Sequence, residues 1–481
     1  MSQSVAESAA AQGYRWRWPA LFVILGAEIM DLIDAMVTNI AGPHIQAELG
    51  GSETLLQWLG AAYTLAMATG LLTGGRLGDV FGRRRMFLVG AVGFTLSSLL
   101  CGVAMSPEML VGSRALQGLF AAVMLPQGLG MIREMFPPAE MGKAFGMFGP
   151  VMGLASVGGP ILAGFLIDAD FFGTGWRMIF LINLPIGLLA LAGGLRYLPE
   201  SKSPNPPSLD LLGVVFASAA GLLIVFPLVQ GREHDWPAWA FVMMAASVAV
   251  FGLFGWYQAR RTRTGRDPLV EGSLFRKRAF NGGLVTGLVF FAGMSGFMLV
   301  FNLYTQIGLH YSPLKAGLAG VPWSVGMIIG FGLAQPLLKF GRRCLQGGTL
   351  LMTLGVVLVW VTLQIAGIGV TPWQLTPGLI VTGIGMGLLM APFFNLVLAG
   401  VEDRESGSAS GALTAVQQLG GALGVALLGT VFFGRLGDIP SPETFESAME
   451  TTLWVTAGML LLTFVVSFLL PKHVKEEDLQ H

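Results

Sequence analysis

Three acidic residues lie inside one long apolar stretch near the start of the chain. The stretch is bounded by Pro19 and Pro43 and contains Glu28, Asp31 and Asp34. If it forms a helix, the three side chains fall within about 120° of arc at 100° per residue, so one face presents them all. Carboxylates inside a membrane span are costly and often belong to proton relays. We therefore predict a proton-binding face on this helix.

One arginine in another apolar stretch is the candidate partner of these acids. Asp34 lies nine residues before Pro43, and Arg114 lies seven residues after Pro107. With the first stretch running outward and the second inward, the two residues lie about 13 Å and about 10 Å from the outer end. An unpaired arginine at this depth would cost about 2.5 to 3.5 kcal/mol or more. We expect Asp34 and Arg114 to pair, with Asp34 as the first candidate for the proton carrier.

The roles of the other two acids stay open. Asp31 is nearest the middle of the stretch and could instead be a buried hydrogen-bonding group, whereas Glu28 lies further inward and could reach the interface. The second half of the chain offers only amides at comparable depth, such as Asn395, Gln417 and Gln418. The acidic trio is therefore the only evident proton-binding apparatus.

Long apolar stretches are the elements that must position these residues. The 481-residue chain is 53% hydrophobic and 12% charged, and that charged share is about half of what soluble domains carry. Crossing about 30 Å of hydrocarbon takes about 20 mainly apolar residues. Fourteen such stretches are present, centred near residues 30, 65, 96, 120, 155, 187, 220, 248, 291, 325, 357, 387, 421 and 461. We predict an all-α polytopic membrane protein with 14 transmembrane helices.

The basic residues predict the orientation of these helices. With the N-terminus inside the cell, 23 of the 28 lysine and arginine residues fall in cytoplasmic segments. Arg114 falls within a span, and the four on the outer side are Arg177, Arg232, Lys315 and Arg435. Because cytoplasmic loops carry an excess of Lys and Arg, we expect both termini in the cytoplasm. The protein would be a multi-pass protein of a bacterial cell (inner) membrane.

An internal repeat indicates how the helices are grouped. The sequence Phe-Gly-Arg-Arg occurs at residues 81–84 and again at 340–343, an offset of 259 residues. This offset pairs helices 1 to 6 with helices 9 to 14, and transporters are often built from such repeats with the substrate site between them. Helices 7 and 8 would be an insertion. The expected parts are a tail (1–17), a six-helix bundle (18–198), the two-helix insertion with its linkers (199–279), a second six-helix bundle (280–471) and a tail (472–481).

The segment after the second helix carries the first recognisable motif. Residues 75–85 read Gly-Arg-Leu-Gly-Asp-Val-Phe-Gly-Arg-Arg-Arg. This segment resembles the loop motif of the major facilitator superfamily, Gly-x-Leu-Ala-Asp-Arg-x-Gly-Arg-Arg, with two substitutions. The glycine, aspartate and arginine positions that match are Gly75, Asp79, Gly82, Arg83 and Arg84. A carboxylate at this helix end can pair with arginine or with the N-terminus of a facing helix, although a solvated basic loop would also explain the charges.

Three further segments narrow the resemblance. Residues 114–118 resemble the superfamily motif with a membrane-embedded arginine, and residues 176–187 resemble the 14-helix drug:proton antiporter branch. The fifth stretch is similar to the antiporter motif Gly-x-x-x-Gly-Pro-x-x-Gly-Gly, with alanine at two of its glycine positions. The candidate residues of this motif are Gly158, Gly159, Pro160 and Gly164. Close packing of small residues is an alternative explanation for this motif.

The resemblance implies a proton-coupled exporter that works by alternating access. Its cargo would be lipophilic or amphiphilic small molecules such as drugs, antibiotics or secondary metabolites. Four residues at mid-depth are candidates for the substrate cavity, namely Tyr63, Phe291, Trp323 and Gln417. The expected partners are the cargo, protons and the lipid bilayer. We expect a functional monomer that needs no cofactor, metal or nucleic acid.

Three other functions are compatible with parts of the sequence. A proton-coupled uptake symporter would share the fold, but the antiporter motif disfavours it. An intramembrane enzyme could use the Asp31-x-x-Asp34 spacing to hold a metal diphosphate, but it would need a second aspartate-rich segment that the chain lacks. A transport-inactive receptor or scaffold is disfavoured because it would have no use for costly buried acids.

Overall fold

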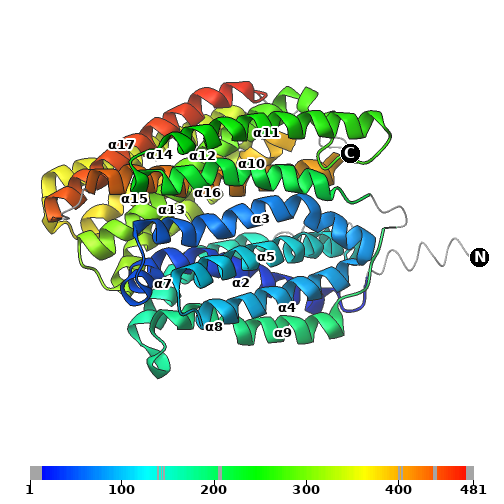
Figure 1. Ribbon diagram of the computed structural model, residues 1–481, viewed down its shortest axis with the longest axis horizontal. Helices are drawn as coiled ribbons and strands as arrows, with labels where there is room; N and C mark the ends of the chain where they lie inside the picture. Colours follow the sequence, from blue (N-terminus) through cyan, green and yellow to red (C-terminus); the bar gives the residue numbers. More distant parts are fainter. Residues whose placement is uncertain are drawn as a thin grey trace, which may run out of the picture.

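The computed structural model describes residues 14–137, 140–141, 143–144, 147–203, 208–398, 401, 405–436 and 441–472. In these residues all regular secondary structure is helical (Figure 1). The first group of helices is α2 (Arg17–Leu49), α3 (Glu53–Phe81), α4 (Arg83–Gly102), α5 (Pro107–Met135), α7 (Phe148–Asp168), α8 (Met178–Leu181) and α9 (Asn183–Tyr197). The insertion helices are α10 (Leu211–Gln230) and α11 (Ala238–Arg263). The second group is α12 (Arg278–Leu303), α13 (Pro313–Leu337), α14 (Arg342–Ala366), α15 (Pro372–Leu398), α16 (Ser406–Leu436) and α17 (Pro442–Val466).

A helix covers each of the fourteen positions at which the sequence predicts a span. Within the described residues, twelve helices are long and apolar enough to cross a membrane. The two others are α2, which carries Glu28, Asp31 and Asp34, and α7, of which only the part from Val157 is counted as a shorter apolar helix. The all-helical membrane fold is confirmed, whereas the count of fourteen spans stays a prediction.

The helices pack in two groups with the same internal arrangement. In the first group α5 packs against α3 and α4, and α2 packs against α7 and α9. In the second group α15 packs against α13 and α14, and α12 packs against α16 and α17. These are the pairs that an offset of 259 residues relates. The main contacts between the groups join α3 to α16 and α7 to α13, and α2 also touches α12 and α13.

The insertion helices cover one of these two seams. Helix α10 packs against both α3 and α16, and α11 packs along α10 (Figure 1). Arg76 near the end of α3 holds the linkers on both sides of the insertion. Its Nη1 donates to the carbonyl of Ser208 at 3.2 Å, and its Nη2 donates to the carbonyls of Leu269 at 3.2 Å and of Pro268. The insertion is thus attached to α3 through main-chain acceptors.

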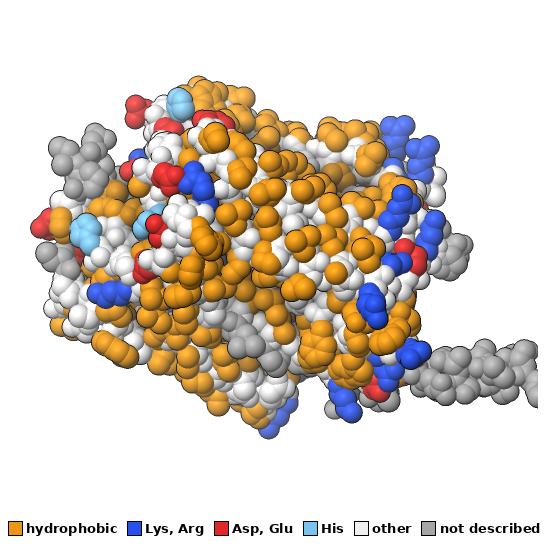
Figure 2. Space-filling view, turned by 90° about the horizontal axis from the view of Figure 1, so that it is seen from below, with side chains coloured by type: hydrophobic (Ala, Val, Ile, Leu, Met, Phe, Trp, Pro, Cys, Tyr) orange, Lys and Arg blue, Asp and Glu red, His pale blue; other side chains and the backbone are white. Residues whose placement is uncertain are grey.

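Charged side chains gather at the two ends of the molecule, with a broad apolar band between them (Figure 2). One end, here called the basic end, holds mainly lysine and arginine, and the other holds most of the visible histidine and acidic residues. The end of α3, the end of α11 and the start of α12 lie at the basic end. Such an apolar band is what a lipid-facing surface requires.

Candidate functional site

The predicted pair of Asp34 and Arg114 is present at the centre of the first group. Asp34 of α2 is fully buried and Arg114 of α5 is 1% exposed. Nη1 of the guanidinium donates to Oδ2 of the carboxylate. Arg114 has two further acceptors, Oε1 of Gln117 at 2.6 Å and the carbonyl of Leu59 at 3.2 Å. Two of the three acceptors of Arg114 are therefore neutral groups whose hydrogen bonds do not depend on the charge of Asp34.

Two amide side chains complete the surroundings of Asp34. Nε2 of Gln117 and Nδ2 of Asn183 each donate to Oδ1 of Asp34 at 2.8 Å. Both amides also contact the hydroxyl of Ser98, at 2.8 Å and 3.3 Å respectively. The carboxylate thus accepts hydrogen bonds from α5 and α9 at once. A buried charge needs such satisfaction to be tolerated.

Close packing of α3 on α5 brings a tyrosine to the same cluster. A Cβ atom at Gly118 would lie 2.3 Å from the carbonyl oxygen of Tyr63, so only glycine permits this approach. The guanidinium carbon of Arg114 lies 4.3 Å from the centre of the Tyr63 ring, within the range of a cation–π contact. The Tyr63 hydroxyl donates to Oδ1 of Asp31. Tyr63 is therefore part of the charge cluster.

The three acids differ in how firmly they are held. Asp34 accepts hydrogen bonds from three side chains, whereas Asp31, which is 6% exposed, accepts one from Tyr63. Glu28 is half-buried and has no hydrogen-bond partner among the described residues. The structure therefore places all three on α2, with the constraint on the carboxyl group decreasing from Asp34 to Glu28.

The loop motif forms a compact ion-pair network at the basic end. Arg83 donates to Oδ1 of Asp79 at 3.0 Å through Nη2 and to Oε1 of Glu134 on α5 at 2.7 Å through Nη1. Gly82 connects α3 to α4 with a φ of 102°, a conformation that favours glycine. Arg84 donates to the carbonyl of Leu195 at 2.5 Å. These contacts all lie within the first group, and Gly75 lies in the last two turns of α3.

The antiporter motif lies at the second seam between the groups. A Cβ atom at Gly164 of α7 would lie 2.4 Å from Cα of Leu314, and one at Gly317 of α13 would lie 2.4 Å from the carbonyl oxygen of Pro160. Gly159 is buried in α7, whereas a Cβ atom at Gly158 would meet nothing within 4 Å. The motif thus allows backbone contact between α7 and α13, as small residues do in membrane helices.

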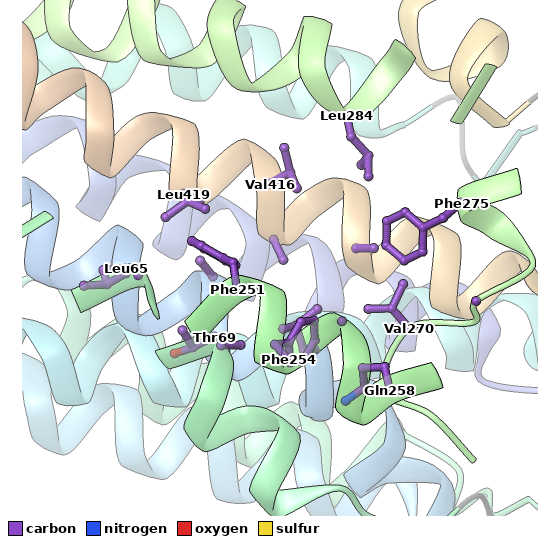
Figure 3. Close-up of a pocket in the computed structure, with 18 of the residues that line it drawn as sticks. Leu65, Thr69, Phe251, Phe254, Gln258, Val270, Phe275, Leu284, Val416 and Leu419 are labelled. Carbon is purple, nitrogen blue, oxygen red and sulfur yellow. The ribbon is translucent and has the colours of Figure 1, made fainter. Parts of the chain in front are cut away.

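A cavity of about 570 Å³ lies on the other seam, beside the insertion helices (Figure 3). None of the four predicted cavity residues lines it. Tyr63 belongs to the charge cluster, Phe291 packs on Phe393, and Trp323 packs on another aromatic ring. Gln417 is half-buried on α16. A contact of these four residues with cargo stays a prediction.

The fold and the buried charge cluster define a polytopic membrane transporter built from two similar helical groups. The chain belongs to the Major Facilitator Superfamily, whose family model matches residues 23–425. It is 52% identical to the probable actinorhodin transporter of Streptomyces coelicolor, over 92% of this chain and 77% of that protein. It is 36% identical to the puromycin resistance protein pur8 of Streptomyces alboniger, over 96% and 93% of the two chains.

Solved structures agree with the fold. The chain superposes on a POT family transporter crystallised with 5-aminolevulinic acid, with a TM-score of 0.68 over 94% of this chain and 96% of that chain. The two sequences are 18% identical, so this likeness concerns the fold alone.

A further relative by sequence is the tetracenomycin C resistance and export protein of Streptomyces glaucescens, 32% identical over 89% of this chain and 78% of that protein.

Sequence reasoning missed the amides that surround Asp34. Gln117 and Asn183 both lie within the segments that resemble the family motifs, at 114–118 and 176–187. Their position in these motif-like segments is the feature of the sequence that could have identified them as site residues. Gln117 lies three residues after Arg114, on the same face of the helix, and could have been chosen on that ground.

Proposed function

We propose that this protein exports lipophilic or amphiphilic small molecules, such as antibiotics and other secondary metabolites, in exchange for protons. The buried pair of Asp34 and Arg114 is the observation that carries the proposal, because a passive scaffold would not retain so costly a group. The names of the relatives support it, since they describe transport of or resistance to actinorhodin, puromycin and tetracenomycin C. In this function the protein moves its cargo without changing it chemically.

The acids of α2 would couple proton movement to cargo movement. Asp34 is our first candidate for the proton carrier, because Gln117 and the carbonyl of Leu59 remain as partners for Arg114 when Asp34 is neutral. Asp31 and Glu28 would be later stations of the same relay. One charge is worth about 2.3 kcal/mol per 100 mV, so one proton at an illustrative driving force of about 180 mV supports about a 1,000-fold cargo gradient.

Contacts between the two groups indicate how access would alternate. Nε2 of Gln57, in the first turns of α3, donates to the carbonyls of Val425 and Ala426 at 3.4 Å and 3.0 Å. On the other seam, Gly164 and Leu314 also touch far from the basic end. We propose that the basic end is cytoplasmic, following the positive-inside rule. The groups then meet on the outer side, and rocking about these seams would expose the acids to each side in turn.

The proposal includes the predicted division into two bundles with a two-helix insertion, both termini in the cytoplasm. Reporter fusions after Pro199 and after Arg260 test this topology, and both should give a cytoplasmic signal. An outside signal at either point would remove α10 and α11 as a membrane hairpin.

Efflux measurements test the function itself. Cells that express the protein should retain less of a lipophilic fluorescent dye than control cells, and a protonophore should remove the difference. In inverted vesicles, a pH gradient with the lumen acidic should drive dye uptake into the lumen. Accumulation by intact cells in place of efflux would favour the uptake symporter, and transport that survives the protonophore would exclude proton coupling.

A further inference from the structure

The cavity on the seam of α3 and α16 offers almost purely apolar walls. Its lining comes from α3, α10, α11, α12, α16 and the linker before α12. Only two of the lining side chains, Thr69 and Gln258, are polar, and both already form hydrogen bonds within the protein. Gln258 donates to Asp210 at 2.8 Å and accepts from the amide of Leu269 at 2.6 Å, and Thr69 donates to the carbonyl of Ala66 at 3.1 Å. An occupant must therefore be held by apolar contact.

The shape of the walls suits a flat molecule of drug size. Phe251 and Phe254 face the space from α11, Val416 and Leu419 face it from α16, and Phe275 of the linker lies across the space from Phe254 (Figure 3). A volume of about 570 Å³ lies within the range of about 300 to 1,000 Å³ that is usual for small-molecule sites. Aromatic rings stack favourably on flat ligands.

The mouth of the cavity faces the lipid. On α11 the lining residues 251, 254, 255, 258 and 259 form one stripe at helical spacing. Helix α11 packs mainly along α10, so the stripe looks across the cavity toward Leu284 of α12 (Figure 3). Phe251 is 39% exposed and Phe275 is 49% exposed. A molecule in the bilayer can therefore enter between α11 and α12.

The mouth also lies close to the basic end. Val270, Gly272 and Phe275 of the linker line that end of the cavity, and the basic residues Arg260 and Arg276 directly follow lining residues. Basic residues next to a span lie at the level of the lipid headgroups. In the proposed orientation the cavity opens into the inner leaflet, where amphiphilic molecules collect.

A narrow seam separates the cavity from the charge cluster. On α3, the neighbours of the lining residues meet α16: Thr64 faces Gly421, and Nε2 of Gln418 contacts the sulfur of Met67 at 3.2 Å. Tyr63, one residue before Thr64, contacts Asp31. Movement of α3 relative to α16 would therefore join the cavity to the acids of α2.

We propose that this cavity is the entry site for flat, lipophilic cargo dissolved in the inner leaflet, which passes between α11 and α12 to reach it. The inference rests on the proposed export function and adds where the cargo first binds. It makes the insertion helices part of the recognition of cargo.

Two glycines of α11 give a matched test. A Cβ atom at Gly255 or at Gly252 would meet nothing within 4 Å, so a larger side chain can be placed at either position without a backbone clash. Gly255 lines the cavity and Gly252 does not. Gly255→Phe fills the cavity, and Gly252→Phe adds the same side chain elsewhere on the helix.

Binding of N-phenyl-1-naphthylamine, a neutral flat dye that fluoresces in apolar surroundings, would be measured on the full-length protein in lipid nanodiscs, with protein-free nanodiscs subtracted. Gly255→Phe should raise the Kd about tenfold, whereas Gly252→Phe should stay within about twofold of the wild type. Unchanged binding by Gly255→Phe, or equal losses in both variants, would overturn the proposal. Native mass spectrometry would detect a third outcome, a structural lipid in the cavity. In that case the wild type would retain a phospholipid that the dye does not displace, and Gly255→Phe would lack it, which would overturn the proposal.

The binding assay is independent of the export function, because it needs no proton gradient. A wild type that binds the dye in the Gly255-dependent manner but fails in the efflux assay would leave the cavity in place and overturn export. The entry site alone would be overturned if the wild type shows protonophore-sensitive transport but Gly255→Phe binds the dye as well as the wild type does.

Discussion

Replacing Asp34 with asparagine keeps the shape of the side chain but reverses one of its hydrogen-bonding groups. In the structure Arg114 points a donor at Oδ2, and Gln117 and Asn183 point donors at Oδ1. An asparagine must aim its NH2 either at the guanidinium or at the two amides, so donor meets donor in both orientations. Arg114 also remains buried without its counter-charge. Breaking a buried ion pair from one side costs about 3 to 5 kcal/mol.

Thermal unfolding of the purified protein in detergent would measure this cost as a fall in Tm. Asp31→Asn is the matched control: among the described residues Asp31 has no ion pair, so the Tm of this variant should fall less. The double variant Asp34→Asn with Arg114→Gln should recover most of the loss, because a pair that is absent costs less than a pair that is broken. Neither Asp34 variant should show efflux driven by a proton gradient. A wild-type Tm for Asp34→Asn would refute the hydrogen-bond reasoning, and full proton-driven efflux would pass the carrier role to Asp31 or Glu28.

Three further outcomes follow from other sites. Asp79→Asn removes the partner of Arg83 at nearly constant volume, so efflux should fall while the amount of protein in the membrane, measured by immunoblot, holds; unchanged efflux would make the motif a folding signal only. Gly164→Leu should abolish efflux and lower Tm, because its side chain would meet the backbone of α13, whereas Gly158→Leu on the same helix should do neither; equal behaviour of the two variants would contradict this. The hydrogen bond from the amide of Ser208 lowers the pKa of Asp267 in the folded protein. The carboxylate therefore stabilises the linker at pH values above the usual aspartate pKa of about 4, and this stabilisation is lost as the pH falls through the lowered pKa of the folded state. The protection of the residue 208 amide, measured as its exchange rate relative to the intrinsic rate at the same pH, should fall over this acidic range, and the same fall in Asp267→Asn would exclude the carboxylate as its cause.

The sequence predicts the helices and the central pair well, for identifiable reasons. Membrane helices need long apolar runs, so the hydrophobic runs of the sequence give the positions of the helices. The pairing of Asp34 with Arg114 is predicted from depths counted from Pro43 and Pro107 and from the lack of other deep acids, although Pro43 lies inside α2, which continues to Leu49. The helix that carries the acids, α2, is not among the twelve candidate spans of the described residues, so the fold is confirmed while the number of spans stays a prediction.

The rest of the site depends on packing that composition does not encode. Gln117 and Asn183 are two amides among several in the spans, and only the contact of α2 with α5 and α9 brings them to one carboxylate. The approach of α3 to α5 at Gly118, which brings the Tyr63 ring to Asp31 and Arg114, is likewise a matter of packing, and contact of Tyr63 with cargo stays a prediction. The cavity walls are phenylalanine, leucine, alanine and valine side chains from several helices and one linker, so no single segment marks them.

The attachment of Arg76 has a consequence for how related proteins can diverge. All three acceptors of its guanidinium are main-chain carbonyls, at residues 208, 268 and 269. A carbonyl is present whatever side chain the residue carries, so substitutions in the two linkers leave this anchor chemically intact. Natural variation can therefore reshape the walls that α10 and α11 offer to cargo while the hairpin stays fastened. For the same reason, chimaeras that exchange this hairpin between relatives should assemble without a compensating change in α3.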